Sequence, residues 1–129
     1  MSEVMVRLRD AINGHDLDAF VSLFAADYRS EQPAHPARAF QGADQVRENW
    51  ASVFSGISDI TADLLVSATT EEGVEIGEWY WYGTHLDGSP FAMRGAIVLG
   101  VDAGRIAWGR LYRLYAAKWG RGPRIDAVR

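Results

Sequence analysis

Apolar residues recur at helical spacing in three stretches of the first half of the chain. The first stretch, Glu3 to Asn13, is amphipathic and is followed by a glycine, a common residue after a helix end. Asp16 is a natural N-cap for a second helix, which we expect to end near Asp27. Helical spacing returns from Asp44 to Phe54. The pattern therefore predicts three amphipathic helices.

A short extended segment is predicted at residues 28–32, between the second and third helices. The sequence Pro33-Ala34-His35-Pro36 follows it. Its two prolines break regular structure and fix a loop that runs to Gly42. His35 is therefore a loop residue. Its imidazole is either an acid or base near neutral pH or a partly exposed histidine held by the backbone.

The second half of the chain has the composition and alternation of strands. Residues 57–70 alternate apolar and polar positions, which predicts a strand with one solvated side. Residues 74–101 form a long hairpin around the turn segment Leu86 to Ser89, and residues 105–115 add a further strand. Helices followed by antiparallel strands define a segregated α+β fold. We expect residues 1–117 to form one domain and residues 118–129 to form a flexible tail.

The register of the hairpin determines which side chains share a face, because a slip of one residue exchanges the two faces. We predict that His85 lies opposite Pro90, which places Glu78 opposite Ile97. We also predict that Ala103-Gly104 is the next turn, which places Ile97 opposite Arg110. One face, taken as the inner one, then carries the following residues: Glu78, Tyr80, Tyr82, Met93, Gly95, Ile97, Leu99, Val101, Ile106, Trp108, Arg110, Tyr112 and Leu114.

Under this register Glu78 and Arg110 are a polar pair within an apolar wall, which is what a small-molecule pocket requires. The pair either orients a ligand or water, with Glu78 as acid or base, or is a buried structural salt bridge. The tyrosine hydroxyls either hold an oxygen of the ligand or belong to the core. The predicted pocket residues are Tyr80, Tyr82, Tyr112, Trp50, Gln32 and Trp108.

Trp79, Trp81 and Arg94 are predicted to lie on the opposite, outer face of the sheet. Indole rings and a guanidinium group can stack there. Such a patch needs a cover, and a second copy of the chain is the simplest one. We therefore expect a homodimer through the outer face.

Composition excludes several classes of function. The chain has 129 residues with 48% hydrophobic content, which is enough for a single domain with a real core. Its net charge of -4 argues against a general nucleic-acid binder. No apolar run approaches the roughly 20 residues of a membrane span, and the first ten residues carry charges where a signal peptide is apolar. We expect a cytoplasmic protein.

Metal and cofactor sites have no signature in the sequence. The chain has no cysteine, and the spacing of His15, His35 and His85 is not that of metal ligands. A glycine-rich phosphate loop is also missing. We therefore expect neither a metal nor a cofactor.

Four phrases resemble the nuclear-transport-factor-2-like superfamily and, within it, the SnoaL-like branch of polyketide cyclase-like proteins. They are NGHDLDAFVSLFAADYRSEQP, FQGADQVRENW, GTHLDGSPFAMRG and DAGRIAWGRLY, spread over residues 13–112. The resemblance implies a cone in which a curved sheet wraps around three N-terminal helices and encloses a deep apolar pocket, with His35 near its mouth. It also implies dimerisation through the outer face of the sheet. Its members differ in chemistry, so the fold leaves function open.

Compared with this family, the chain lacks the residues of the best-understood reactions. The isomerase base that precedes the proline corresponding to Pro33 is replaced by Gln32, and the isomerase tyrosine of the first helix falls on Leu8. The aspartate that in SnoaL-like cyclases follows a tyrosine like Tyr112 is replaced by Leu114. The usual acids are therefore absent.

Two hypotheses remain. In the first, the protein is a cofactor-free cyclase, isomerase or hydrolase for an oxygenated polyketide-like or terpenoid-like compound. Glu78 or His35 then acts as acid or base, and Arg110 and the tyrosines stabilise negative charge. In the second, it is a non-catalytic ligand-binding or dimerisation module in which the same groups only satisfy each other.

Overall fold

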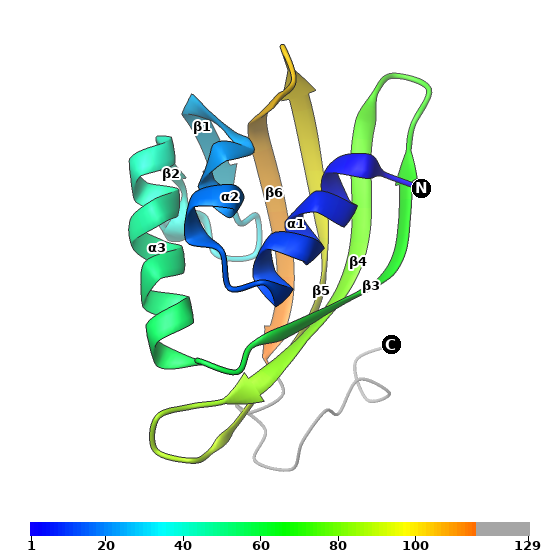
Figure 1. Ribbon diagram of the computed structural model, residues 1–129. Helices are drawn as coiled ribbons and strands as arrows, with labels where there is room; N and C mark the ends of the chain where they lie inside the picture. Colours follow the sequence, from blue (N-terminus) through cyan, green and yellow to red (C-terminus); the bar gives the residue numbers. More distant parts are fainter. Residues whose placement is uncertain (116–129) are drawn as a thin grey trace.

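The computed structural model describes residues 1–115 (Figure 1), and the tail predicted at 118–129 lies outside them. Three α-helices and a six-stranded mixed sheet in this part of the chain confirm the predicted α+β class. The elements in chain order are α1 (Glu3–Asn13), α2 (Leu17–Ser22), β1 (Phe24–Glu31), the 3-10 helix η1 (Pro36–Arg38), β2 (Phe40–Gln41), α3 (Ala43–Gly56), β3 (Thr61–Thr69), β4 (Val74–Thr84), β5 (Pro90–Asp102) and β6 (Arg105–Tyr115).

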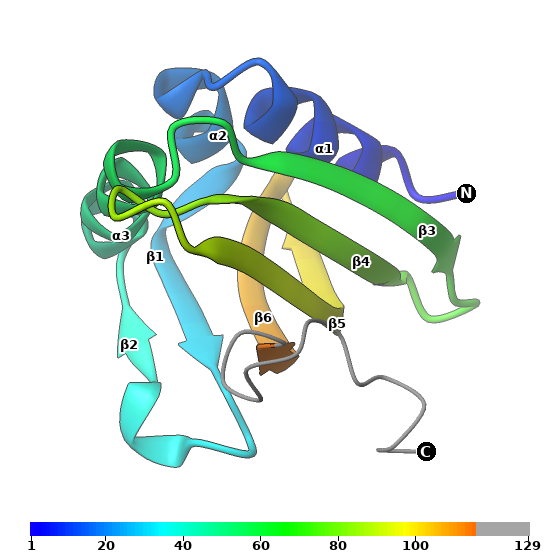
Figure 2. The same ribbon diagram turned by 90° about the horizontal axis from the view of Figure 1, so that it is seen from below.

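The strand order across the sheet is β2-β1-β6-β5-β4-β3. The four long strands β3 to β6 form the predicted antiparallel meander. Strand β1 pairs parallel with β6 and antiparallel with β2. The sheet is strongly curved (Figure 2), and the three helices lie on one side of it (Figure 1).

Helix α1 forms as its sequence predicts. The side chain of Ser2 accepts a hydrogen bond from the Met5 N–H and caps the helix. The buried residues are Met5, Leu8, Ala11 and Ile12, at the spacing of one helical face. This face packs on the sheet.

The second helix is shorter than predicted, because α2 ends at Ser22 and strand β1 begins at Phe24. The Ile106 N–H of β6 donates to the Leu23 carbonyl at 2.8 Å, and Phe24 pairs with Ile106. Pairing with β6 therefore overrides the helical spacing of these residues. The prediction that the helix reaches Asp27 was wrong for this reason.

The hairpin register differs from the prediction by one residue. Thr84, not His85, lies opposite Pro90. The His85 N–H donates to the Ser89 carbonyl at 2.8 Å, and the Gly88 N–H donates to the His85 carbonyl at 2.9 Å. His85 thus belongs to a five-residue loop, which Gly88 closes with a φ of 85°.

The predicted pairing of β5 with β6 is correct next to the turn and wrong beyond it. Asp102 lies opposite Arg105, as expected for a turn at Ala103-Gly104, but the register shifts between Gly100 and Val101. The shift is a β-bulge, in which one strand has an extra residue. The Trp108 indole lies over Gly100, where any Cβ atom would collide with it.

These two shifts exchange the faces of β4 and of most of β6, while β5 keeps its predicted orientation. Trp79 and Trp81 are buried on the inner face, with exposed fractions of 0% and 5%, so their predicted position on the outer face was wrong. Met93, Ile97 and Leu99 of β5 are buried as predicted. The core lies between this face and the helices.

Candidate functional site

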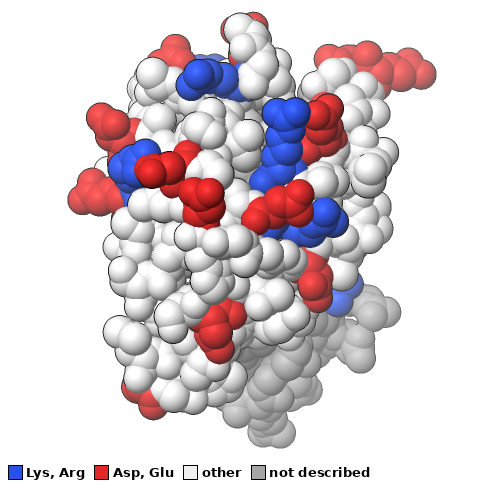
Figure 3. Space-filling model, in the orientation of Figure 1, with Lys and Arg blue, Asp and Glu red and all other residues white. Residues whose placement is uncertain are grey.

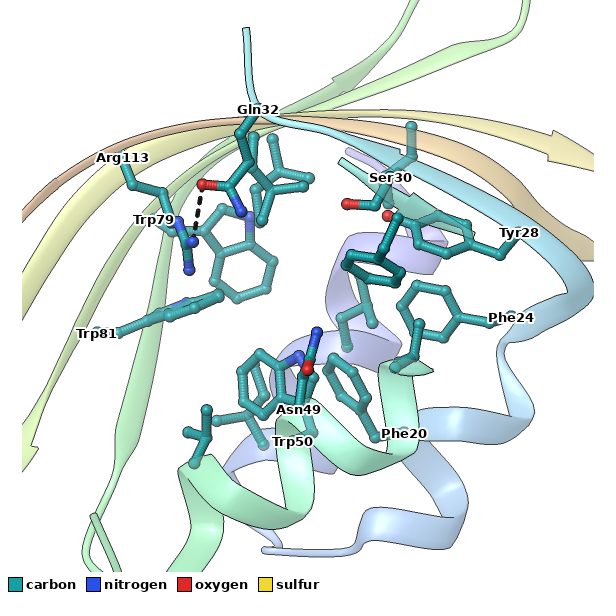
Figure 4. Close-up of a pocket in the computed structure, with 18 residues that line it drawn as sticks. Phe20, Phe24, Tyr28, Ser30, Gln32, Asn49, Trp50, Trp79, Trp81 and Arg113 are labelled. Carbon is teal, nitrogen blue, oxygen red and sulfur yellow. Dashed lines mark hydrogen bonds between the residues drawn. The ribbon is translucent and has the colours of Figure 1, made fainter. Parts of the chain in front are cut away.

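A cavity of about 240 Å³ lies between the inner face of the sheet and the helices (Figure 4). All three α-helices and most strands contribute to its wall. The lining residues are Leu8, Ile12, Phe20, Phe24, Tyr28, Ser30, Gln32, Phe40, Val46, Asn49, Trp50, Val53, Trp79, Trp81, Ile97, Leu99, Leu111 and Arg113. A concave, mainly apolar wall with a few polar groups is the usual form of a ligand site.

Aromatic rings form two sides of the cavity. Trp50 of α3 meets Phe20 of α2 at a centroid distance of 4.3 Å. It also contacts the edge of Trp81, at 5.2 Å and an interplanar angle of 71°. Trp79 lies next to Trp81 at 6.0 Å. These rings offer both faces and edges to an aromatic or polarisable ligand.

Polar groups line the side of the cavity formed by β1. Tyr28 and Ser30 are buried, and both point to the inner face because alternate residues of a strand share a face. Gln32 continues the row two residues later and is 9% exposed. Successive groups are thus about 6–7 Å apart along the backbone. The row faces the aromatic rings of the helices (Figure 4).

Gln32 and Arg113 form a polar contact across the cavity wall. The Arg113 Nη2 donates to Gln32 Oε1 at 2.9 Å. A guanidinium group has only donors, so the amide orientation of Gln32 is fixed by chemistry. The Gln32 NH₂ group then remains to donate. Both side chains reach toward the cavity in Figure 4.

The other polar groups of the wall can also donate, and Ser30 and Asn49 carry acceptor oxygens as well. Within residues 1–115, the indole N–H groups of Trp79 and Trp81 are buried without an acceptor. Burial raises the pKa of Tyr28, and its hydrogen bond with Ser30 only partly offsets this effect. The Tyr28 hydroxyl is therefore neutral at physiological pH and able to donate. The site is suited to a ligand that supplies acceptors.

Carboxylates and imidazoles do not line this cavity in the described part of the chain. The described residues also contain no group of three or more His, Asp or Glu residues that could hold a metal ion. The site therefore offers donors, one guanidinium charge and aromatic surface, but no ordinary side-chain base.

Glu78 and Arg110 do not face the cavity, which corrects their predicted position. Glu78 lies opposite Ala96 on the outer face, and its carboxylate is 3.5 Å from Arg94. Arg110 stacks over the Trp108 ring at 4.8 Å. The two predicted partners thus have other neighbours, because both register shifts moved them outward.

The predicted tyrosines also lie on the outer face. Tyr80 and Tyr82 stack on each other at 5.3 Å, and Tyr112 is 42% exposed. Trp108 belongs to the same face, across Gly100. Their predicted place in the pocket was wrong because the same register shifts turned these side chains to the outer face.

Of the remaining predicted site residues, Gln32 and Trp50 line the cavity. Their contact with a ligand stays a prediction. His35 is exposed in the loop before η1 and is not part of the cavity wall. Arg94 lies on the outer face, as predicted.

Sequence reasoning missed Arg113, Tyr28 and Ser30. In the predicted register Arg113 falls on the outer face, and the shift of one residue in β6 turns it inward. Tyr28, Ser30 and Gln32 alternate along one short strand, and this period of two was the available signal. This alternation places three polar side chains on the inner face of a strand whose other inward residue, Phe24, is apolar.

A curved sheet closed by helices around an apolar cavity defines a small-molecule-binding α+β cone. The sequence matches the family model of the SnoaL-like domain over residues 5–108. The chain therefore belongs to the family of SnoaL-like domains, which confirms the predicted membership. No curated protein matches the sequence.

Solved structures with the same fold agree with this assignment. A protein with a ketosteroid isomerase-like fold from Catenulispora acidiphila, in complex with trimethylamine, is 20% identical with a TM-score of 0.74, covering 87% of this chain and 85% of its own. A cystatin-fold protein from Novosphingobium aromaticivorans is 20% identical with a TM-score of 0.70, covering 88% and 99%. A candidate SnoaL-like polyketide cyclase from Jannaschia is 17% identical with a TM-score of 0.71, covering 86% and 83%. At these identities the likeness shows the fold.

The surface over the helices carries both signs of charge. Figure 3 shows acidic and basic side chains interspersed on this face. Arg7 pairs with Glu3 at 2.6 Å, and Arg47 pairs with Asp18 at 2.7 Å. This face therefore has no basic patch of the kind that binds nucleic acids. None of the described helices is both long and apolar enough to span a bilayer.

Proposed function

We propose that this protein binds a small, largely apolar molecule with oxygen acceptors in the cavity between the sheet and the helices. The carrying observation is the pairing of Gln32 with Arg113 at 2.9 Å in a wall that is otherwise aromatic and aliphatic. Apolar contact would supply most of the affinity. The donors would fix the orientation of the ligand, because a ligand without acceptors would leave them unsatisfied.

A neutral aromatic probe tests this proposal. Three of the five tryptophans line the cavity, so binding of methyl 2-naphthoate should change the intrinsic fluorescence. Val53 lines the cavity from α3, and Val53→Phe should fill the space and abolish the change. Ser52→Phe, at the exposed neighbouring position, is the matched control and should bind as the wild type does. An equal response in both variants would place binding elsewhere.

The second candidate function is a cofactor-free cyclase, isomerase or hydrolase for an oxygenated polyketide-like or terpenoid-like compound. The family and the donors of the wall support it, since Arg113 and the neutral Tyr28 would stabilise negative charge on an enolate oxygen while hydroxide from the solvent takes the α-proton. Exchange of the α-protons of 2-tetralone in D₂O, followed by NMR, is a direct test. Exchange above the buffer rate that is lost in Tyr28→Phe supports catalysis, and the buffer rate alone contradicts it.

A second copy of the chain is the proposed partner at the outer face of the sheet. Large apolar side chains are exposed there, including Ile76, Tyr112 and Leu114, each about two-fifths exposed. The face also carries the Glu78–Arg94 pair, so it holds both signs of charge, as a contact between two copies about a two-fold axis requires. Exclusion of water from these side chains would stabilise such a dimer.

A further inference from the structure

The size of the cavity limits the ligand. An apolar cavity of about 150 Å³ holds one benzene molecule, so a cavity of about 240 Å³ holds one substituted ring or two fused rings. A four-ring compound would extend beyond a cavity of this volume. The site is thus smaller than the pockets of roughly 300–1,000 Å³ that take drug-sized ligands.

The wall opposite the polar row selects for rings. Phe20 and Trp50 approach from the helices, and Trp79 and Trp81 approach from β4 (Figure 4). The planes of Trp50 and Trp81 are inclined at 71°, so a flat ligand can stack on one indole and meet the edge of the other. Aliphatic chains gain less from this geometry.

The charge of the wall selects the polar end of the ligand. Arg113 brings the one formal charge among the lining residues, and it is positive. The Gln32 amide, whose oxygen accepts from Arg113, directs its NH₂ group to the same region. A guanidinium fork together with an amide N–H matches the two oxygens of a carboxylate. A cationic ligand would meet the same charge unfavourably.

We infer that the ligand is an aromatic carboxylic acid of one or two fused rings, with its carboxylate at Gln32 and Arg113 and its rings against Trp50 and Trp81. This inference rests on the proposed binding function of the cavity. It extends that proposal by specifying the charge and the size of the ligand.

Three probes with the same rings but different charge test the inference. Tryptophan fluorescence and calorimetry would compare 2-naphthoate, methyl 2-naphthoate and 2-naphthylmethylammonium. We expect 2-naphthoate to bind about tenfold or more tightly than the ester, since a hydrogen bond to a charged group is worth about 1.5–3 kcal/mol. The ammonium probe should bind most weakly, and 2-anthroate should bind more weakly than 2-naphthoate because of its third ring.

Two arginines on one strand provide matched variants. Arg113→Gln should reduce the affinity for 2-naphthoate to that for the ester and leave ester binding nearly unchanged. Arg110→Gln changes the outer face of the same strand and should retain the full preference. Gln32→Glu is a second variant that keeps Arg113 and adds a negative charge, so it should weaken 2-naphthoate and spare the ester. Circular dichroism would confirm that each variant is folded.

The outcomes separate this inference from the proposed function. Equal binding of the acid and the ester, or tighter binding of the ammonium probe, would overturn the inference and leave the binding function standing. Retention of the acid preference in both Arg113→Gln and Gln32→Glu would also overturn it. If no probe binds the wild type, both the inference and the proposed function fail.

Discussion

Gln32 and Arg113 are 81 residues apart in the sequence, and their side chains meet at 2.9 Å. The parallel pairing of β1 with β6 brings them together, because Glu31 lies opposite Arg110 and Gln32 follows directly. The contact thus joins the strand that carries the polar row to the strand that carries the charge. It fixes the amide of Gln32 and sets which groups of the cavity can donate.

Removal of the Gln32 amide should destabilise the fold. Gln32→Leu leaves a guanidinium N–H without its carbonyl acceptor in a largely buried place. We expect the free energy of unfolding to fall by about 1–3 kcal/mol. Urea denaturation followed by circular dichroism measures this loss. Gln41→Leu, at an exposed position of β2, is the control and should change stability little. Equal losses in both variants would contradict a specific role for the contact.

Gly109 should not tolerate a side chain. A Cβ atom there would lie 2.5 Å from the Tyr28 Oη and 3.0 Å from a methyl group of Leu99. Gly109→Ala should therefore displace the Tyr28 ring and cost about 1–3 kcal/mol, as overpacking of a core does. Gly56, at the end of α3, has open space where its Cβ would be, so Gly56→Ala should be nearly neutral. Thermal unfolding would compare the two variants. An unchanged melting temperature for Gly109→Ala would show that the side chains around Gly109 can move to accept a methyl group.

Stability should decrease at alkaline pH because of Tyr28. Burial raises the pKa of Tyr28 above its ordinary value of 10.0. The unfolded chain then releases the phenolic proton first, so the free energy of unfolding falls as the pH rises above 10 and stops falling once the folded-state pKa is passed. Below pH 10 the contribution is fully present. Urea unfolding across this range should show a smaller decline for Tyr28→Phe than for Tyr112→Phe at the exposed face. Identical declines would contradict the assignment.

Glu78→Gln should affect neither ligand binding nor stability by much. The Glu78 carboxylate is 3.5 Å from Arg94, and the two side chains are 47% and 39% exposed. An exposed pair of this kind contributes about 0–1 kcal/mol. Titration of the variant with the naphthalene probes should match the wild type. Loss of binding in Glu78→Gln would place the site on the outer face and contradict the cavity as its location.

A charge at the centre of the outer face should dissociate the proposed dimer. Sedimentation equilibrium should give a mass near twice 14.3 kDa for the wild type. Tyr112→Glu should give the monomer mass, because it would place two like charges in an apolar contact. Ser55→Glu, at an exposed position of α3, should leave the mass unchanged. A monomeric wild type would contradict the proposed partner.

The local patterns of the sequence were sufficient for the architecture. Helical spacing located α1 and α3, and turn residues located the meander, because each of these signals is carried by neighbours in the chain. The family phrases added the cone and the cavity. The end of α2 is the exception, since the backbone around Phe24 is held by β6, a strand far away in the sequence.

The faces of the sheet were decided by single residues that only the folded chain reveals. Inclusion of His85 in the loop and the bulge at Gly100 each moved the register by one position. Because side chains alternate, each shift exchanged inner and outer residues completely. Trp79, Trp81 and Arg113 thereby entered the cavity, and Glu78 and Arg110 left it.

The sequence by itself determined that this protein has an α+β fold with an apolar interior, because composition and periodicity are properties of the chain alone, and the resemblance to its family indicated the cone. The tertiary structure decided which polar groups enter that interior. Gln32 and Arg113 meet through the pairing of distant strands. The register of backbone pairing determines which side chains face the interior, and a shift of one residue reverses the faces. Local propensities do not encode the register to within one residue.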